Sequence, residues 1–275
     1  MTEDLLLLAC DTAVAAGNLL VDLQQQAAVA AEKPGTGNVV TDADYAAEAL
    51  IRERISASRP GDQILGEEGG TSGGPADVVW IVDPLDGTTN YLYGLPAWSV
   101  SIAAVVSGAA AAAAVYVPAR GELFSATRGG GATRQGAGGQ PVRLRCSQGV
   151  PLGQALVATG FGYHAGERRL QGAVLAQVLP QVRDIRRFGS AAMDLCYVAA
   201  GRWDAYFETG LELWDIAAGG LIAREAGAMV GGLHGQPAGT PMIMAAAPPL
   251  FGALHDLVVA AYAGQAGEND QLPGH

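Results

Sequence analysis

The sequence predicts an α/β fold, and three patterns along its 275 residues lead to that prediction. Helical periodicity covers roughly the first sixty residues, and apolar, β-branched runs separated by glycine and proline follow it. From about residue 146, candidate strands and helices alternate, which is typical of layered α/β proteins. We expect one domain over 1–275, sheet-rich to about 145 and alternating over about 146–262, with a flexible tail at 263–275.

The first part is expected to begin with two helices. Apolar residues recur at helical spacing over 3–26, where Thr2 can act as the N-cap. Proline and glycine over 32–40 predict a loop or loose hairpin. Thr41 and Asp44 then form a capping-box pattern that opens a second helix through Ile55. The strands expected next are 63–65, 78–83, 99–106, 110–117 and 123–127, with glycine-rich connectors at 71–76 and 129–141.

The second part alternates between the two kinds of element. Expected strands are 155–159, 184–187, 205–207 and 242–246, and expected helices are 167–179, 190–200, 216–226 and 250–261. Alternation of this kind points to an α/β arrangement of the second part.

Composition narrows the range of partners. The formal net charge is −11 and the pI about 4.7, which argues against nucleic-acid and acidic-membrane partners. Cys10, Cys146 and Cys196 show no CxxC spacing and fit small buried side chains in a reduced cytoplasm. The first basic residue is Lys33, so no signal-peptide pattern is evident, and no apolar run approaches the roughly 18 residues of a membrane span. We expect a soluble, cytoplasmic protein.

The chemistry is concentrated in residues 78–91. The run Val78–Val82 predicts a buried strand that ends at Asp83, and Pro84, which has no N–H to donate, is expected to prevent its continuation. Asp86 follows, and the small residues of Gly87–Thr89 can turn backbone N–H groups toward an anion. Two carboxylates beside such a turn predict a divalent cation that holds a phosphate.

Two more acids, Glu67 and Asp215, also lie where a strand ends or a helix begins. Taken alone, Asp215 is better explained as a helix cap and Glu67 as an exposed turn residue. Four carboxylates in one cleft would repel strongly, by roughly 4 kcal/mol for a pair 4 Å apart at an effective dielectric near 20. Cations would relieve that repulsion, and an all-oxygen ligand set favours Mg²⁺ or Mn²⁺ over zinc.

Other phosphate and metal motifs fit poorly. An EF-hand loop that began at Asp83 would need an acid or amide at Leu85 and a glutamate at Gly94. The spacing from Asp83 to Asp86 is one residue longer than the haloacid dehalogenase motif requires, and no P-loop is present. Two basic pairs, Arg168–Arg169 and Arg186–Arg187, are interpreted as solvated or ion-paired, although one of them could border a substrate pocket. The four histidines are interpreted as surface residues: His164, His234, His255 and His275.

Three motifs together resemble the signatures of the inositol monophosphatase family. They are Gly66-Glu67-Glu68, Trp80-Ile81-Val82-Asp83-Pro84-Leu85-Asp86-Gly87-Thr88-Thr89-Asn90 and Trp214-Asp215-Ile216-Ala217-Ala218-Gly219. The segments Arg187–Ala192 and Asp204–Glu208, and the pattern around Lys33 and Val39–Asp44, extend the likeness to roughly residues 5–260. Asn38 departs from it, because the family often has aspartate there.

The resemblance implies a layered α-β-α-β-α sandwich, usually a homodimer, that hydrolyses phosphate monoesters with two to three Mg²⁺ ions and is inhibited by lithium. It implies that Glu67, Asp83 and the Leu85 carbonyl hold one metal. By position, the resemblance also implies that Asp83, Asp86 and Asp215 hold a second metal and that Glu67 faces a third. It implies that Thr88 orients a water molecule together with Glu67, and that backbone N–H groups of Gly87 and Thr88 bind the phosphate. The residues implied to contact substrate hydroxyls are Asp86, Ala191, Glu208 and Asp215.

The function predicted is therefore a Mg²⁺-dependent phosphatase, with inositol-1-phosphate or a similar small polyol phosphate as substrate. Fructose-1,6-bisphosphatase, histidinol-phosphatase and 3′-phosphoadenosine nucleotidase activities remain alternatives, because related folds host them. A non-catalytic metal-dependent binding or regulatory protein is the alternative outside the enzyme class.

Overall fold

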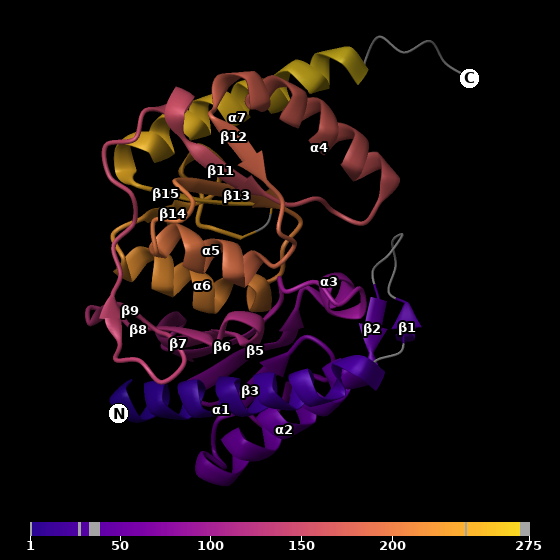
Figure 1. Cartoon of the computed structure of the whole chain (residues 1–275), viewed down its shortest axis with the longest axis vertical. Helices are drawn as coiled ribbons and strands as arrows, with labels where there is room; N and C mark the ends of the chain where they lie inside the picture. The colour runs from indigo at the N-terminus through magenta and orange to yellow at the C-terminus, as the bar shows by residue number, and fades with distance from the viewer. Residues whose placement is uncertain (1, 27–28, 33–38, 240, 270–275) are drawn as a thin grey trace.

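The computed structural model describes residues 2–26, 29–32, 39–239 and 241–269. Its helices and sheets stack in five layers, in the order α-β-α-β-α, as Figure 1 shows. This stacking confirms the predicted fold class.

The first helix layer consists of α1 (Thr2–Leu23) and α2 (Asp42–Ser58). By length and composition α1 could cross a membrane. In the fold, however, α1 packs on α2 and on β6, β7 and β8, with Leu5 and Leu20 among its fully buried side chains. Its apolar face is thus accounted for by core packing. At the start of α2, Thr41 and Asp44 form both hydrogen bonds of the predicted capping box.

The second layer is an eight-stranded sheet in the order β10-β9-β8-β7-β6-β5-β3-β4, in which only β3 and β5 pair in parallel. Strands were not expected within 71–76 or 129–141, yet β4 and β9 form there, because pairing with β3 and β8 outweighs the poor strand propensity of glycine-rich segments. The strands are β3 (Gln63–Gly66), β4 (Gly70–Ser72), β5 (Val78–Asp86), β6 (Ser99–Val106), β7 (Ala109–Val117), β8 (Glu122–Thr127), β9 (Gly131–Gln135) and β10 (Val142–Arg143).

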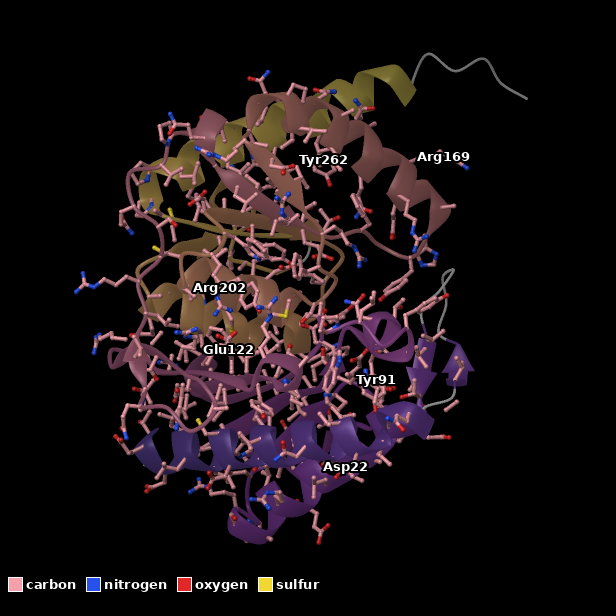
Figure 2. The ribbon with its side chains drawn as sticks, viewed as in Figure 1. Asp22, Tyr91, Glu122, Arg169, Arg202 and Tyr262 are labelled. Atoms are coloured by element: carbon pink, nitrogen blue, oxygen red, sulfur yellow. The ribbon has the colours of Figure 1, made fainter. Side chains whose placement is uncertain are left out.

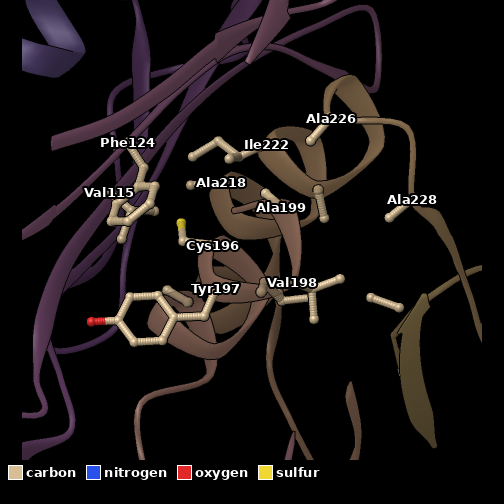
Figure 3. Packing of buried hydrophobic residues seen from close by; sticks show 14 of the residues in the cluster. Val115, Phe124, Cys196, Tyr197, Val198, Ala199, Ala218, Ile222, Ala226 and Ala228 are labelled. Carbon is tan, nitrogen blue, oxygen red and sulfur yellow. The ribbon is translucent and has the colours of Figure 1, made fainter. Parts of the chain in front are cut away.

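The central layer holds α5 (Ala191–Ala199) and α6 (Leu213–Glu225) between the two sheets. Small side chains let these helices approach closely: a Cβ on Gly219 of α6 would lie 2.8 Å from the Leu195 Cβ of α5. Figure 3 shows the packing that results, with Phe124 of the large sheet close to Ile222 and Cys196 of the helices. Cys196 is fully buried among apolar neighbours, as expected for a small hydrophobic side chain.

The fourth and fifth layers complete the sandwich. A five-stranded sheet has the order β12-β11-β13-β15-β14, and α4 (Ala165–Val178) and α7 (Pro248–Asn269) cover its outer face. Two expectations were wrong here. The short strand β14 was not predicted, and residues 263–269, predicted as part of a flexible tail, continue α7. The strands are β11 (Leu156–Thr159), β12 (Asp184–Arg186), β13 (Ala205–Thr209), β14 (Met229–Gly231) and β15 (Met242–Ala246).

Shorter elements lie outside the main layers. The predicted hairpin is present as antiparallel β1 (Val29–Glu32) and β2 (Val39–Thr41), whereas Lys33, Asn38 and His275 lie outside the described residues. A short helix, α3 (Thr88–Leu92), follows β5. Single 3₁₀ turns occur at Gln24–Gln26, Pro118–Arg120, Leu152–Gln154, Leu179–Gln181 and Leu233–Gly235.

Candidate active site

The end of β5 carries two of the predicted acids, and its shape differs from the expectation. The strand continues through Pro84 to Asp86, although proline was expected to end it. Its pairing with β6 is irregular between Asp83 and Asp86, so Pro84 occupies a bulge, where no ladder N–H is required. The bulge also lets the Leu85 N–H donate to Asp83 Oδ1 at 2.9 Å. Asp83 is 1% exposed and Asp86 8%.

A tight turn follows at Gly87, the N-cap of α3. Its φ of +99° disfavours any L side chain, and a Cβ there would lie 2.9 Å from the Ala97 carbonyl oxygen. The Thr88 hydroxyl lies 3.1 Å from both Asp44 Oδ1 and the Leu85 carbonyl oxygen. Residues of β5, α2 and α3 are thereby tied together at one point.

The Asp86 carboxylate points at the start of α5. It accepts hydrogen bonds from the Ser190 hydroxyl at 2.7 Å and from the backbone N–H groups of Ala192 at 2.8 Å and Ala191 at 3.2 Å. Burial raises the pKa of Asp86 to about 6, although these three hydrogen bonds favour the charged form and oppose the rise. Asp86 is therefore fixed in direction by the helix terminus even though burial disfavours its charge.

Asp215 comes from the first turn of α6 and faces the two acids of β5. The N-cap is Glu212 rather than Asp215, which instead accepts the Glu212 N–H at 2.7 Å. Carboxylate oxygens of Asp83, Asp86 and Asp215 lie within 4.8 Å of one another. Desolvation, followed by repulsion from neighbouring acids, raises the pKa of both Asp83 and Asp215 well above the ordinary value.

This donor set fits a hard divalent cation. It supplies only oxygen ligands, two of its three carboxylates are buried and the third is half-buried, and a bound cation would remove their mutual repulsion. Glu67, just beyond β3, is held near the group because its N–H donates to the Val82 carbonyl at 3.2 Å. Glu67 also contributes to the raised pKa of Asp83, which places its charge close by.

The acids open into a cavity of about 400 Å³. Glu208 of β13 lies on the side of this cavity formed by the smaller sheet, and the Tyr206 hydroxyl donates to it at 2.6 Å. Burial raises the pKa of Glu208 to about 7, with the Tyr206 hydrogen bond acting in the opposite direction. The predicted site residues all line the cavity: Glu67, Asp83, Leu85, Asp86, Gly87, Thr88, Ala191, Glu208 and Asp215.

Some residues that line the cavity or contact its lining were not assigned to the site from the sequence. Asp44 was predicted as a capping residue only, and its contact with Thr88 depends on a fold that joins α2 to α3. His164 was interpreted as a surface residue, yet it lines the cavity together with Tyr163. Arg187 lines the cavity too, in agreement with the alternative that one basic pair borders a substrate pocket. Arg186, in contrast, pairs with Asp184 at 2.6 Å, as one of the alternatives held. No local pattern distinguishes the two arginines.

Comparison with known proteins agrees with this geometry. The chain matches the inositol monophosphatase family over residues 1–269. The chain belongs to the inositol monophosphatase family. It is 49% identical over 225 residues to the inositol-1-monophosphatase of Mycobacterium leprae, which covers 78% of this chain and 76% of that relative. It is 44% identical over 223 residues to the Nus factor SuhB of Escherichia coli strain K12, covering 80% and 82%.

A solved structure gives the same result. The SuhB protein of Mycobacterium tuberculosis superposes with a TM-score of 0.81 at 41% identity, over 95% of this chain and 98% of that one. The chain is a phosphoric monoester hydrolase of a metal-dependent family, as predicted.

Proposed function

We propose that this family member is a Mg²⁺-dependent phosphatase whose substrate is inositol-1-phosphate or a similarly small polyol phosphate. The observation that carries the proposal is the convergence of Asp83, Asp86 and Asp215, whose carboxylate oxygens lie within 4.8 Å of one another in the lining of the cavity. The name of the Mycobacterium leprae relative supports the substrate.

Oxygen ligands would hold the metals. Glu67, Asp83 and the Leu85 carbonyl form one set, Asp83, Asp86 and Asp215 form a second, and Glu67 faces a third position. Mg²⁺ bound there would neutralise the phosphate charge and lower the pKa of water at the site. The hydrogen bond from the Leu85 N–H to Asp83 supports the first set, because it keeps the connecting backbone compact.

Backbone and hydroxyl groups position the phosphate and the attacking water. The N–H groups of Gly87 and Thr88 open α3 and are available to phosphate oxygens. The Thr88 hydroxyl has one proton, and Asp44 or the Leu85 carbonyl accepts it. The hydroxyl oxygen can therefore accept a hydrogen bond from water, while Glu67 takes up the proton that the water loses.

The opposite side of the cavity would bind the polyol. Asp86, Glu208 and Asp215 offer carboxylates to hydroxyl groups, and Ala191 would meet the substrate at the start of α5, where its N–H already donates to Asp86. Glu208 has a fixed orientation through Tyr206, which favours a substrate with a hydroxyl at a defined place rather than any phosphate ester.

A substrate screen tests the proposal. The purified protein would be given inositol-1-phosphate, fructose-1,6-bisphosphate, histidinol phosphate and 3′-phosphoadenosine 5′-phosphate, with Mg²⁺ or Mn²⁺. We expect the highest kcat/KM on inositol-1-phosphate with Mg²⁺, and inhibition by lithium. Phosphate release from none of them would contradict the proposal, and preference for a bisphosphate would replace its substrate.

The oligomeric state is proposed from the family resemblance, and the location and partners are proposed from the composition. We propose a single domain over 1–275, a homodimer, and a cytoplasmic protein that binds neither nucleic acid nor membrane. Sedimentation analysis of the purified chain checks the dimer, which a purely monomeric species at micromolar concentration would contradict.

A further inference from the structure

A second hollow, at the other end of α5 from the acids, is lined by arginines. It has a volume of about 420 Å³, and Arg134, Arg143, Arg145 and Arg202 surround it, with Val142, Leu144 and Ala200 between them. We name it the arginine pocket. Four of the sixteen basic residues of a chain with net charge −11 therefore surround one cavity.

The strand pattern places two of these arginines on the same side. Leu144 and Cys146 are buried at 7% and 4% exposure, whereas Arg143 and Arg145 alternate with them and are exposed. Extended chain turns successive side chains to opposite faces, so both arginines project outward from the segment that anchors them. Arg134 of β9 lies on the opposite face of the β9–β10 pair, because its partner in the ladder is Val142 of β10, whose side chain points away from that of Arg143. The arginine pocket at this edge of the sheet is therefore lined from both faces.

The other side of the pocket is pre-ordered. Arg134 Nη1 donates to Glu122 Oε1 at 2.6 Å, and Arg202 Nη1 donates to Glu122 Oε2 at 2.6 Å. The Arg202 guanidinium also lies 4.5 Å from the centre of the Tyr197 ring. Figure 2 shows Arg202 and Glu122 together between the central helices and the large sheet. Glu122 pairs with Arg134 and Arg202, and the described residues hold no ion pair of Arg143 or Arg145, so the pocket keeps an excess of positive charge.

We propose that the arginine pocket binds a compact anion with two or more phosphate groups. A guanidinium matches phosphate with paired hydrogen bonds, and the volume lies in the range of small-ligand sites. An excess of about three charges suits more than one phosphate group. An extended nucleic-acid backbone fits less well, because it would run beyond the pocket onto a surface of an acidic protein.

The arginine pocket and the active site lie at opposite ends of α5. The N–H groups of Ala191 and Ala192 at its start hold Asp86, whereas Ala200, its C-cap, lines the arginine pocket. All nine residues of the helix are buried, and its length is about 13 Å. The proposed site is thus separate from the catalytic one and does not rest on the proposed function.

Calorimetric titration with inorganic tripolyphosphate, in metal-free buffer at low salt, tests the proposal. We expect saturable binding at one site per chain that weakens as salt rises. The double variant Arg143→Ala/Arg145→Ala should bind at least about 30-fold more weakly, since two charge-assisted contacts are lost. The matched control Arg54→Ala/Arg169→Ala removes two exposed arginines elsewhere and should bind as the unmodified protein does; Figure 2 shows Arg169 on α4, away from the pocket.

Equal melting temperatures and unchanged phosphatase activity of both double variants would show that the fold is intact. The proposal is overturned by an absence of saturable binding, or by equal loss in the pocket variant and the control. It is also overturned if Asp86→Asn, rather than the pocket variant, alters the binding, because the anion would then occupy the active site. Tighter binding of an RNA oligonucleotide or of polyglutamate than of tripolyphosphate would exclude a compact phosphate ligand.

Discussion

Replacing Asp83 with asparagine should stabilise the metal-free protein while it removes catalysis. Two unit charges 4.8 Å apart repel by about 3.5 kcal/mol at an effective dielectric near 20, and Asp83 faces both Asp86 and Asp215 within that distance. Asparagine removes one charge but can still accept the Leu85 N–H. Proton uptake already relieves part of the repulsion in the wild type. We therefore expect the free energy of unfolding of the metal-free protein to rise by about 2 to 4 kcal/mol at pH 8, or its Tm by roughly 4 to 10 °C.

The gain should depend on pH. The three aspartates have pKa values above their ordinary range, about 6 for Asp86, so they bind protons more tightly in the folded state. Folded metal-free protein therefore loses stability as pH rises from about 4 through 6 and beyond. Below about pH 4 the carboxyls are protonated in both states, and the advantage of Asp83→Asn should vanish.

Thermal unfolding with EDTA across pH 4 to 8, followed by titration with Mg²⁺, provides the assay. Wild type should gain stability from Mg²⁺, and the variant should gain little, since ligand binding adds to the stability of the folded state. A variant that melts below wild type at pH 8 without metal, or that gains equally at pH 4 and 8, would refute the electrostatic reasoning. Retained turnover would refute the metal assignment.

Three further substitutions test the cavity. Thr88→Val keeps the shape but removes the hydroxyl that contacts Asp44 and Leu85; we expect kcat to fall about 100-fold with little change in KM, as loss of a group that positions water predicts. Glu208→Gln should raise KM and abolish an inflection of kcat/KM near pH 7, because the wild-type carboxyl loses its proton there and then binds the substrate better. An unchanged pH profile would contradict a role of Glu208 in substrate binding. Gly87→Ala should lower stability by about 1 to 3 kcal/mol in denaturant unfolding, because φ is +99° there and the methyl would meet a carbonyl oxygen; wild-type stability would show that the turn relaxes.

Much of the site could be predicted because its acids belong to strong local patterns. Asp83 and Asp86 follow an apolar strand, and Asp215 lies in the first turn of a helix, so the edges of elements locate all three. Their convergence could be predicted only through family resemblance, since β5 and α6 are more than a hundred residues apart. The continuation of β5 through Pro84 was not predictable, because a bulge that tolerates proline depends on the partner strand β6.

Other features lay beyond any local pattern. β9 and β14 are short and contain glycine, so their strand conformation depends on pairing with β8 and β15 rather than on propensity. The partner of Thr88, Asp44, had a sufficient local explanation in the capping box. The distinction between Arg186 and Arg187 depends on which of the two lies beside Asp184, a contact of tertiary origin.

The close approach at Gly219 makes the distance between two helices a dimension of the active site. α5 directs Asp86 through its first N–H groups, and α6 carries Asp215, so the gap between the helices sets the separation of those two carboxylates. A methyl group at Gly219 would meet the Leu195 Cβ at 2.8 Å and the Ala192 carbonyl oxygen at 3.1 Å, and so would push apart the two helices that support the acids. Gly219 and Leu195, which do not line the cavity, therefore help to set the spacing of the metal-binding acids through the packing of α6 against α5.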